Sequence, residues 1–303
     1  MISNQSKDRG NDWRKRLDGL VPEQIDSKRI LIIGCGSVGS FMASELVRTG
    51  IRHMTLIDHD IVEWPNLTRT VYTASDVGSL KVEALDMHLR TIFPDLNIKT
   101  YGIGIQTVGA FNTWSLSEEF VNEFKSADLI IAAADQPKAS GLINRYSYMY
   151  GKTVVYPGLY KGAKGGEVVT VVPGKTPCYH CSTGNVRREI SESQGVARVL
   201  NYGTNRLEGE IALGSDIHFV CSAANKIVLS LLSQDHPDLP LAKFMGKIID
   251  TGSTYLTLGM EPDYYLFPAL HKNVPGQYAF QSAWIKPSFS SDCEICGSGL
   301  SHS

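Results

Sequence analysis

The sequence predicts an α/β protein: a Rossmann-like, mostly parallel sheet with helices on both faces, extended by antiparallel strands and carrying a four-cysteine zinc site. Three observations favour this fold. Apolar, strand-like segments alternate with segments of helical periodicity between residues 29 and 157, which is typical of a parallel sheet covered by helices. A glycine-rich turn follows the first apolar segment. Strand-like runs and two close cysteine pairs occupy the later part of the chain.

The alternating half is expected to contain βαβ units. Strands are expected at residues 30–33, 53–58, 129–134 and 153–156, with a further strand near Ile98. Helices are expected at about 38–49, 82–92, 115–125 and 137–150, and the second of them has Val82, Leu85, Leu89 and Ile92 at helical spacing. A strand that returns through a helix pairs in parallel with the earlier strand, so these units predict parallel pairing.

The later half has a different pattern. Strands are expected at residues 167–172, 246–251, 254–259 and 264–267, and a strong helix is expected at 217–232. Residues of about 183–214 are polar and weakly periodic, as in long functional loops. We therefore expect an N-terminal arm at 1–28, a single domain at 29–296 with halves at 29–157 and 158–296, and a flexible tail at 297–303.

The composition is that of a folded globular protein. Hydrophobic residues make up 43% and charged residues 20% of the 303 residues, which argues against disorder and coiled coil. A formal net charge of -2 offers no basic field for a nucleic acid. The longest apolar run, at 129–134, is far shorter than the roughly 18 residues that cross a bilayer, and no apolar stretch follows the basic N-terminus. We expect a cytoplasmic protein without nucleic acid or membrane as partner.

Gly34, Gly36 and Gly39 form a G-x-G-x-x-G turn between a strand and a helix. In this context the glycines allow a tight turn and a close approach of phosphate to the helix N-terminus. Asp58 ends the next strand, where an acidic side chain can accept hydrogen bonds from ribose hydroxyls. The pattern predicts nucleotide binding. Dehydrogenases and methyltransferases share it, and a merely structural turn is the alternative.

A more specific pattern follows Asp58. It consists of a second Asp two residues on, Asn-Leu-x-Arg in the next loop, Gly-x-x-Lys at the start of a helix, and an Asp after a later apolar strand. In order and spacing it resembles the ThiF/MoeB/HesA family, the adenylating domain shared with ubiquitin-activating enzymes, over about residues 29–296. On this resemblance the family positions fall on Asp58, Asp60, Asn66, Arg69, Lys81 and Asp135.

The resemblance implies ATP-dependent adenylation, in which a carboxylate attacks the α-phosphorus of ATP and pyrophosphate leaves. Negative charge builds on the triphosphate, so we expect Arg69 and Lys81 to act on phosphate oxygens and Asp135 to hold Mg²⁺. These three are the expected catalytic residues; Asp60 and Asn66 join the glycines and Asp58 in binding the nucleotide. A helix N-cap is the alternative role for Asp135. The family usually has Asp-Asn where this chain has Asp135-Gln136.

Four of the six cysteines form two Cys-x-x-Cys pairs, Cys178/Cys181 and Cys293/Cys296. Two such pairs supply four thiolates for one tetrahedral Zn²⁺ and leave no open position, so the ion is expected to be structural. Redox-active pairs are the alternative. His180, inside the first pair, is expected to be a bystander.

The resemblance also implies the partners: a ubiquitin-like or sulfur-carrier protein with a C-terminal Gly as substrate, and a second copy in a homodimer. Family members that form their own thioester carry a cysteine in the crossover loop, but residues 182–220 contain none. Cys221 lies in the next helix, where a buried core thiol is the more common role. The adenylate would then pass to a separate thiol-bearing protein. Arg14 and Arg16 are candidates for reaching the phosphates of a partner subunit.

Other functions remain open. The same chemistry could nucleotidylate a short peptide, or a carboxylate on a modified tRNA, which the neutral charge balance disfavours. An NAD-dependent oxidoreductase would share the glycine turn and Asp58, but it would not need Arg69, Lys81 and Asp135 together. A non-catalytic, zinc-stabilised partner of an active homologue would not need to retain the phosphate-binding residues.

Overall fold

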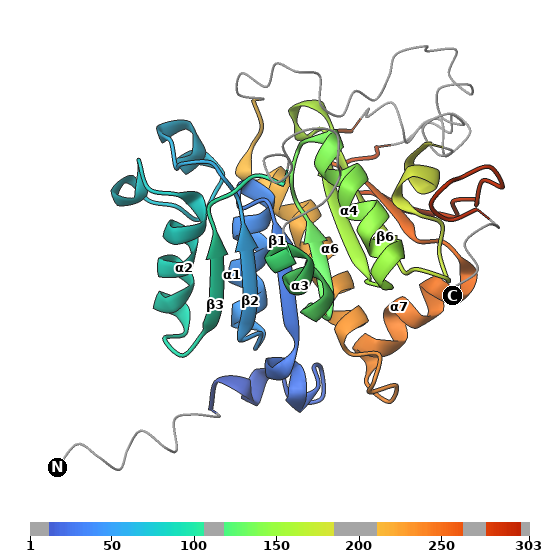
Figure 1. Cartoon of the computed structure of the whole chain (residues 1–303), viewed down its shortest axis with the longest axis horizontal. Coiled ribbons are helices and arrows are strands. Elements are labelled where there is room, and N and C mark those ends of the chain that lie inside the picture. The colour runs from blue at the N-terminus through green and yellow to red at the C-terminus, as the bar shows by residue number, and fades with distance from the viewer. Residues whose placement is uncertain (1–11, 106–117, 185–210, 263–276, 298–303) are drawn as a thin grey trace.

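The computed structural model describes residues 12–105, 118–184, 211–262 and 277–297 (Figure 1). Its strands are β1 (Arg29–Ile33), β2 (His53–Ile57), β3 (Asn97–Tyr101), β4 (Leu129–Ala132), β5 (Val154–Leu159), β6 (Gly165–Val171), β7 (Tyr255–Gly259) and β8 (Ser282–Ile285). Its longer helices are α1 (Ser37–Arg48), α2 (Lys81–Ile92), α3 (Glu118–Ser126), α4 (Pro137–Tyr150), α6 (Gly214–Leu232) and α7 (Pro240–Thr251). Within these residues, no helix combines the length and the apolar character needed to cross a membrane.

The strands form one sheet in the order β3-β2-β1-β4-β5-β6-β7-β8. The strands from β3 to β5 in this order pair in parallel, and β6, β7 and β8 extend the sheet in antiparallel fashion. The predicted fold class is therefore confirmed. The strand order reverses at β1, because β2 pairs with one side of β1 and β4 with the other. Open α/β sheets bind their ligands at such a reversal, outside the carboxyl ends of the strands.

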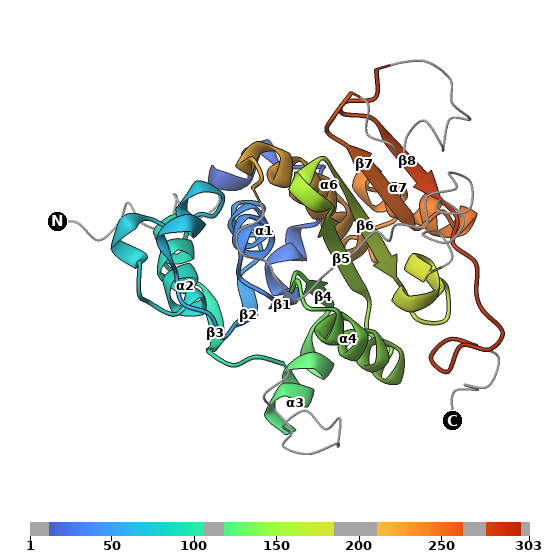
Figure 2. The ribbon, with the colours of Figure 1, turned by 90° about the horizontal axis from the view of Figure 1, so that it is seen from above.

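Helices cover both faces of the parallel strands. Ile30 and Ile32 belong to a buried cluster that includes residues of α1, α2, α6 and α7, whereas Leu31 and Ile33 belong to a second cluster with residues of α3 and α4. Figure 2 shows α1 and α6 on the opposite side of the sheet from α3 and α4. Strands that are buried on both faces consist of nearly continuous apolar runs, which explains why the sequence identifies them.

Part of the expectation for the later half is wrong. Residues 246–251 belong to the end of α7 and not to a strand. Leu241, Met245 and Ile248 recur at helical spacing across α7, and Pro240 occupies its first position, as is common for helices. The sequence pattern gives no sign of β8, which pairs with β7 through Leu256↔Trp284. The strand expected at 264–267 and residues 185–210 of the expected loop lie outside the described residues.

The described part of the N-terminal arm packs against residues that precede β2 and follow α2. Trp13 makes an edge-to-face contact with Phe93 at a centroid distance of 5.2 Å, and the Arg52 guanidinium lies 4.6 Å from the Trp13 ring centroid. Arg14 donates hydrogen bonds to the carbonyl oxygens of Glu23 and Pro22 at 2.6 and 2.9 Å. The Arg14 side chain is therefore engaged within its own arm, while Arg16, the other candidate for a partner subunit, is exposed.

Glu123 anchors α3 to the edge of the sheet. This residue is 9% exposed, and its carboxylate accepts hydrogen bonds from Lys99 Nζ of β3 and from Thr55 Oγ1 of β2, the latter at 2.9 Å. Burial acts to raise the pKa of Glu123, but the bonds from Lys99 and Thr55 stabilise the carboxylate and lower the pKa overall. The folded state therefore favours the ionised form.

We expect Glu123→Gln to lower the free energy of unfolding at neutral pH by about 1.5–3 kcal/mol, the range for hydrogen bonds to charged groups. The folded-state pKa lies below the ordinary glutamate value of 4.5. The difference in the free energy of unfolding between wild type and variant should therefore have its full size above pH 4.5. It should disappear as the pH falls through the folded-state pKa. Urea unfolding of both proteins across this pH range measures the difference. A difference that does not change with pH would contradict the role of the carboxylate.

Candidate functional site

The glycine turn lies where the strand order reverses. The chain leaves β1 at Gly34, and Gly36 is the N-cap of α1. Gly34 N–H donates to Ile57 O at the end of β2, and Ala133 N–H donates to Ile33 O at the end of β1, both at 2.8 Å. The segments that follow β2 and β4 therefore flank the turn on both sides.

The glycines of the turn are required for different reasons. Gly34 has a φ of +97°, and a Cβ on it would lie 2.6 Å from the carbonyl group of Ala133. A Cβ on Gly39 would lie 1.8 Å from Gly34 O. A Cβ on Gly36 would meet nothing within 4 Å, so there is open space beside the N-terminus of α1, where backbone N–H groups can bind phosphate.

Two backbone groups hold the Asp58 carboxylate beside the turn. Cys35 N–H donates to Asp58 Oδ2 at 2.7 Å, and Asp60 N–H donates to Asp58 Oδ1 at 2.9 Å. Each carboxylate oxygen keeps a further lone pair, so ribose hydroxyls could bind without displacing these donors. Burial, together with the nearby Asp58 charge, raises the pKa of the Cys35 thiol well above 9.0. Cys35 therefore contributes its backbone N–H and not a thiolate.

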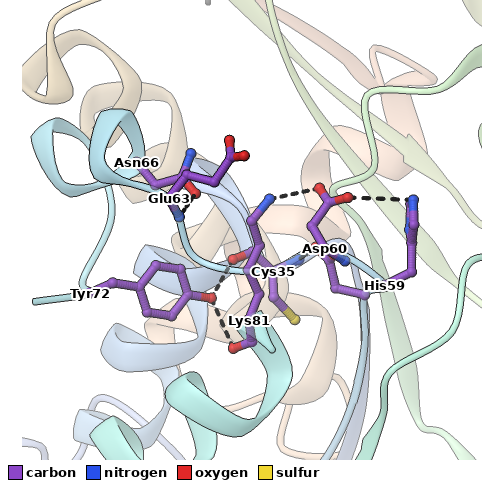
Figure 3. A network of polar contacts seen from close by, with 8 residues as sticks. Cys35, His59, Asp60, Glu63, Asn66, Tyr72 and Lys81 are labelled. Carbon is purple, nitrogen blue, oxygen red and sulfur yellow. Dashed lines mark hydrogen bonds and ion pairs between the residues drawn. The ribbon is translucent and has the colours of Figure 1, made fainter. Parts of the chain in front are cut away.

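Lys81 begins α2 and points toward Asp60 (Figure 3). Its N–H donates to Asp60 O at 2.9 Å, and its Nζ lies 2.7 Å from Asp60 Oδ2. The Lys81 side chain is 11% exposed, whereas that of Asp60 is 50% exposed. Water can solvate Asp60 when the ion pair opens, and exposed ion pairs are worth little. Lys81 is therefore a nearly buried cation that can exchange this partner for a phosphate oxygen.

Asn66 shapes the loop that carries Arg69. This loop contains the 3-10 turn η4 (Trp64–Thr68), and Asn66 Oδ1 accepts a hydrogen bond from Glu63 N–H at 2.9 Å. Arg69 N–H donates to Asn66 O at 3.1 Å. A Cβ on Gly214 would lie 3.6 Å from Arg69 Cα, so the half-buried Arg69 sits against the first residue of α6. The Asn66 side-chain oxygen thus stabilises the loop itself by accepting a hydrogen bond within it.

Asp135 is exposed three residues beyond the end of β4. The N-cap of α4 is Gln136, which makes no side-chain capping bond, so the alternative role of Asp135 as the N-cap is wrong. Ala133 and Ala134, which precede Asp135, lie against Gly34 of the glycine turn. Mg²⁺ is usually bound by one or two carboxylates together with substrate phosphates. A single exposed carboxylate at this edge of the sheet fits that arrangement.

Sequence reasoning misses Tyr72 and His59. The Tyr72 hydroxyl donates to the carbonyl oxygens of Cys35 and Lys81, and His59 Nε2 lies 3.4 Å from Asp60 Oδ1. His59 also forms, with Asp58 and Asp60, a group close enough to share a metal ion. Exposed acidic groups commonly lie this close together without binding a metal ion, so we assign no ion to this group. No local signal marks Tyr72, because its partners lie in other segments.

The two cysteine pairs meet in space. Cys178 and Cys293 are 115 residues apart, and their Sγ atoms lie 3.7 Å from each other. The Sγ atoms of Cys181 and Cys296 are 3.5 Å apart, and all four sulfurs lie within 4.8 Å of one another. Tetrahedral Zn²⁺ with Zn–S bonds of about 2.3 Å requires S···S distances of about 3.8 Å. The cluster therefore fits the four-cysteine zinc site that the sequence predicts.

Local structure on each side of the cluster orients the thiols. After β6, Ser182 N–H donates to Cys178 O at 2.9 Å, in a helical turn that contains the first pair. In the C-terminal segment, Gly297 N–H donates to Cys293 O at 2.8 Å. A Cβ on Gly297 would lie 2.5 Å from that oxygen, so the turn requires glycine. His180 is exposed and outside the four-sulfur group, in agreement with a bystander.

Cys221 is a core thiol in the structure. It is fully buried in α6, with its Sγ 3.9 Å from Val38 O of α1. Burial raises the pKa of Cys221 to about 12. A cysteine nucleophile must be accessible and must form the thiolate. The geometry therefore favours packing over nucleophilic attack.

Comparison with known proteins finds a matching family model and several similar sequences. The ThiF family model matches residues 15–255. Ubiquitin-like modifier-activating enzyme 5 of Oryza sativa subsp. japonica is 32% identical over 163 residues, which cover 53% of this chain and 39% of that protein. The enzyme of the same name from Drosophila virilis is 33% identical over 178 residues, covering 58% and 44%. The chain thus spans about two fifths of the length of these relatives.

The fold itself recurs among solved structures. The crystal structure of E. coli MccB with ATP matches with a TM-score of 0.59 and 18% identity, covering 91% of this chain and 68% of that chain. At this identity the match establishes a shared fold. The roles of individual residues in this chain therefore rest on their own geometry.

Proposed function

The chain belongs to the ThiF family, and we propose that it is an adenylyltransferase. In this proposal it uses ATP to activate the C-terminal glycine carboxylate of a ubiquitin-like or sulfur-carrier protein and releases pyrophosphate. The relatives named above are ubiquitin-like modifier-activating enzymes, which supports a ubiquitin-like substrate. The tail of such a protein can present its carboxylate at the edge of the sheet where the glycine turn lies.

One observation carries the proposal. Short hydrogen bonds join the glycine turn to Asp58 and Asp58 to Asp60, which in turn pairs with Lys81. A phosphate-binding backbone, a ribose acceptor and a nearly buried cation therefore lie side by side. An NAD-dependent oxidoreductase needs the first two features but has no need of a cation held at the start of α2.

The proposed reaction requires cations and no general base. A carboxylate oxygen of the substrate forms a bond to the α-phosphorus of ATP, and the bond from that phosphorus to the oxygen bridging to the β-phosphorus breaks. Pyrophosphate leaves with the electron pair, and the product is an acyl-adenylate. An α-carboxyl group has a reference pKa of about 3.3–3.7 and is ionised at neutral pH. Catalysis then depends on positioning and on electrostatic stabilisation of the leaving group.

Each residue of the site would have its own role in binding ATP or in stabilising the charge that develops during the reaction. Asp58 would bind the ribose, and the backbone between Gly34 and Gly39 would bind phosphate at the N-terminus of α1. Lys81 and Arg69 would neutralise the negative charge that develops on the triphosphate. Asp135 would hold Mg²⁺, which supplies further positive charge to the phosphates when bound. Asp60 and Asn66, which are expected to bind the nucleotide, would also support Lys81 and the loop of Arg69, respectively.

We propose that residues 29–296 act as one adenylation domain, with the nucleotide bound by the half at 29–157 and the zinc by the half at 158–296. The protein would work as a homodimer. Because residues 182–220 contain no cysteine and Cys221 is buried, the activated carboxylate would pass to a separate thiol-bearing protein, either a conjugating or a sulfur-transfer protein.

ATP–pyrophosphate exchange tests this function. With Mg²⁺ present, we expect a ubiquitin-like or sulfur-carrier protein that ends in Gly to stimulate exchange. The same protein with its C-terminus converted to an amide should not, because an amide cannot attack as a carboxylate does. The matched pair separates carboxylate activation from simple ATP hydrolysis.

Two outcomes would contradict the proposal. Stimulation by a short peptide, with none by any carrier protein, would favour nucleotidylation of a peptide by the same chemistry. Tight binding of NAD without measurable binding of ATP would favour an oxidoreductase, because both classes of enzyme share the glycine turn and Asp58.

A further inference from the structure

Tyr72 links two parts of the nucleotide pocket that lie on different elements. The residue is 4% exposed. Its hydroxyl oxygen lies 2.6 Å from Cys35 O in the glycine turn and 3.1 Å from Lys81 O at the first residue of α2 (Figure 3). A hydroxyl group has one proton, so this proton is shared between the two carbonyl oxygens.

The remaining hydrogen bonds close a ring around the pocket. Cys35 N–H binds Asp58, Asp60 N–H binds Asp58, and Lys81 N–H binds Asp60 O, at distances of 2.7, 2.9 and 2.9 Å. This part of the ring passes through residues 58–60, of which the last two are exposed. Tyr72 closes the ring on its buried side. A buried contact between two backbone groups limits how far they can move apart.

The Tyr72 hydroxyl is suited to remain protonated and to donate a hydrogen bond. Burial raises its pKa far above the ordinary tyrosine value of 10.0, with further contributions from Cys35 and Asp58. The hydroxyl therefore keeps its proton at neutral pH. Phenylalanine would fill nearly the same space but would leave the two buried carbonyl oxygens without this donor.

We propose that Tyr72 is a positioning residue for adenylation: its hydroxyl holds the first turn of α2 against the glycine turn and so fixes Lys81 relative to the bound phosphates. The inference rests on the proposed function. Tyr72 would contact neither the nucleotide nor the substrate and would act through Cys35 and Lys81. A displacement of about 1 Å at a reacting centre can cost about 10²-fold in rate, so a small loosening of this contact has a measurable effect.

Tyr72→Phe tests the inference. We expect kcat for ATP–pyrophosphate exchange, per nucleotide-binding site titrated with ATP, to fall by about 10–100-fold. The KM for ATP should change by less than about threefold, because Asp58 and the backbone donors that bind the ground state remain. Hydrogen exchange of the amides at 34–39 and at the start of α2 should become faster in the variant, while that of α6 should not change.

Tyr148→Phe is the matched control. The Tyr148 hydroxyl also donates to a backbone carbonyl, that of Thr176. Tyr148 lies in the last turn of α4, beside the four cysteines and at the opposite end of this helix from Asp135. We expect this variant to lose some thermal stability and to keep its kcat.

The measurements on the variants test the positioning role of Tyr72, and the measurement on the wild type tests the proposed function. If Tyr72→Phe keeps its kcat, or if kcat per titrated site falls no further than in Tyr148→Phe, the positioning role is overturned while the proposed function stands. If the wild type itself shows no pyrophosphate exchange with any carboxylate substrate, the proposed function is overturned and this inference with it. A variant that folds poorly is identified by its ATP titration, and the exchange of its remaining folded amides still reports whether the glycine turn has loosened.

Discussion

Lys81→Met should reduce Mg²⁺-dependent ATP–pyrophosphate exchange by at least about 10²–10³-fold, the cost of removing one preorganised charge-stabilising group from an active site. The methionine keeps most of the apolar stem, so packing at the start of α2 is retained. Asp60 loses its cation, but its side chain is 50% exposed, and water can solvate the carboxylate. The expected result is therefore a folded protein that binds the nucleoside part of ATP and turns over very slowly.

Lys28→Met is the control for this experiment. Lys28 Nζ pairs with Asp235 Oδ2 at 2.8 Å, almost the 2.7 Å of the pair between Lys81 and Asp60. It lies just before the start of β1, at the end of the sheet opposite the glycine turn, so its loss removes an ion pair without touching the pocket. Exchange rates measured for both variants, with thermal melts to confirm folding, give the comparison. Near-normal turnover in Lys81→Met would remove this residue from the catalytic set.

Cys293→Ser should release the zinc and destabilise the fold. Structural zinc binds the folded state and not the unfolded chain, so its binding energy is folding energy. At a free zinc concentration a thousandfold above Kd, the loss amounts to about 4 kcal/mol, which would lower the melting temperature by roughly 10 °C in a protein of this size. Elemental analysis should find about one zinc per wild-type chain and almost none in the variant.

His180→Ala is the matched control for the zinc experiment, because His180 lies between two of the four cysteines but is exposed and outside the cluster. It should keep the metal and the melting temperature of the wild type. Unchanged zinc content in Cys293→Ser would exclude the four-cysteine site. If both thiol pairs were redox centres instead, reductant and not chelator would change the melting temperature.

The elements that the sequence predicts correctly are those whose signals are local. Residues 30–33 of β1 and the whole of β4 are buried and consist of continuous apolar runs. β2 is also buried over most of its length but is interrupted by the polar Thr55, and the glycine turn needs the positive φ of Gly34. The helix α7 has an equally local signal, but a reading of residues 246–251 alone misses it, because the helical spacing is visible only when Leu241 and Met245 are included.

β8 could not be predicted in the same way. Its four residues, Ser282–Ile285, lie at the edge of the sheet and have no run of apolar residues long enough to mark a strand. They form a strand because β7 offers unpaired backbone groups, as in the pairing of Leu256 with Trp284. A strand at the edge of a sheet depends on its neighbour more than on its own residues.

By itself the sequence determined which chemical groups are present and in what order: the glycine turn, the carboxylates, Arg69, Lys81 and two cysteine pairs. Only the tertiary structure decided which of them meet. It joined thiols 115 residues apart in one cluster, paired Lys81 with Asp60, and placed the Tyr72 hydroxyl between Cys35 and Lys81. The physical reason is that backbone preferences and spacing act between neighbours in the chain, whereas hydrogen bonds and metal clusters form between segments that only the packed sheet brings together.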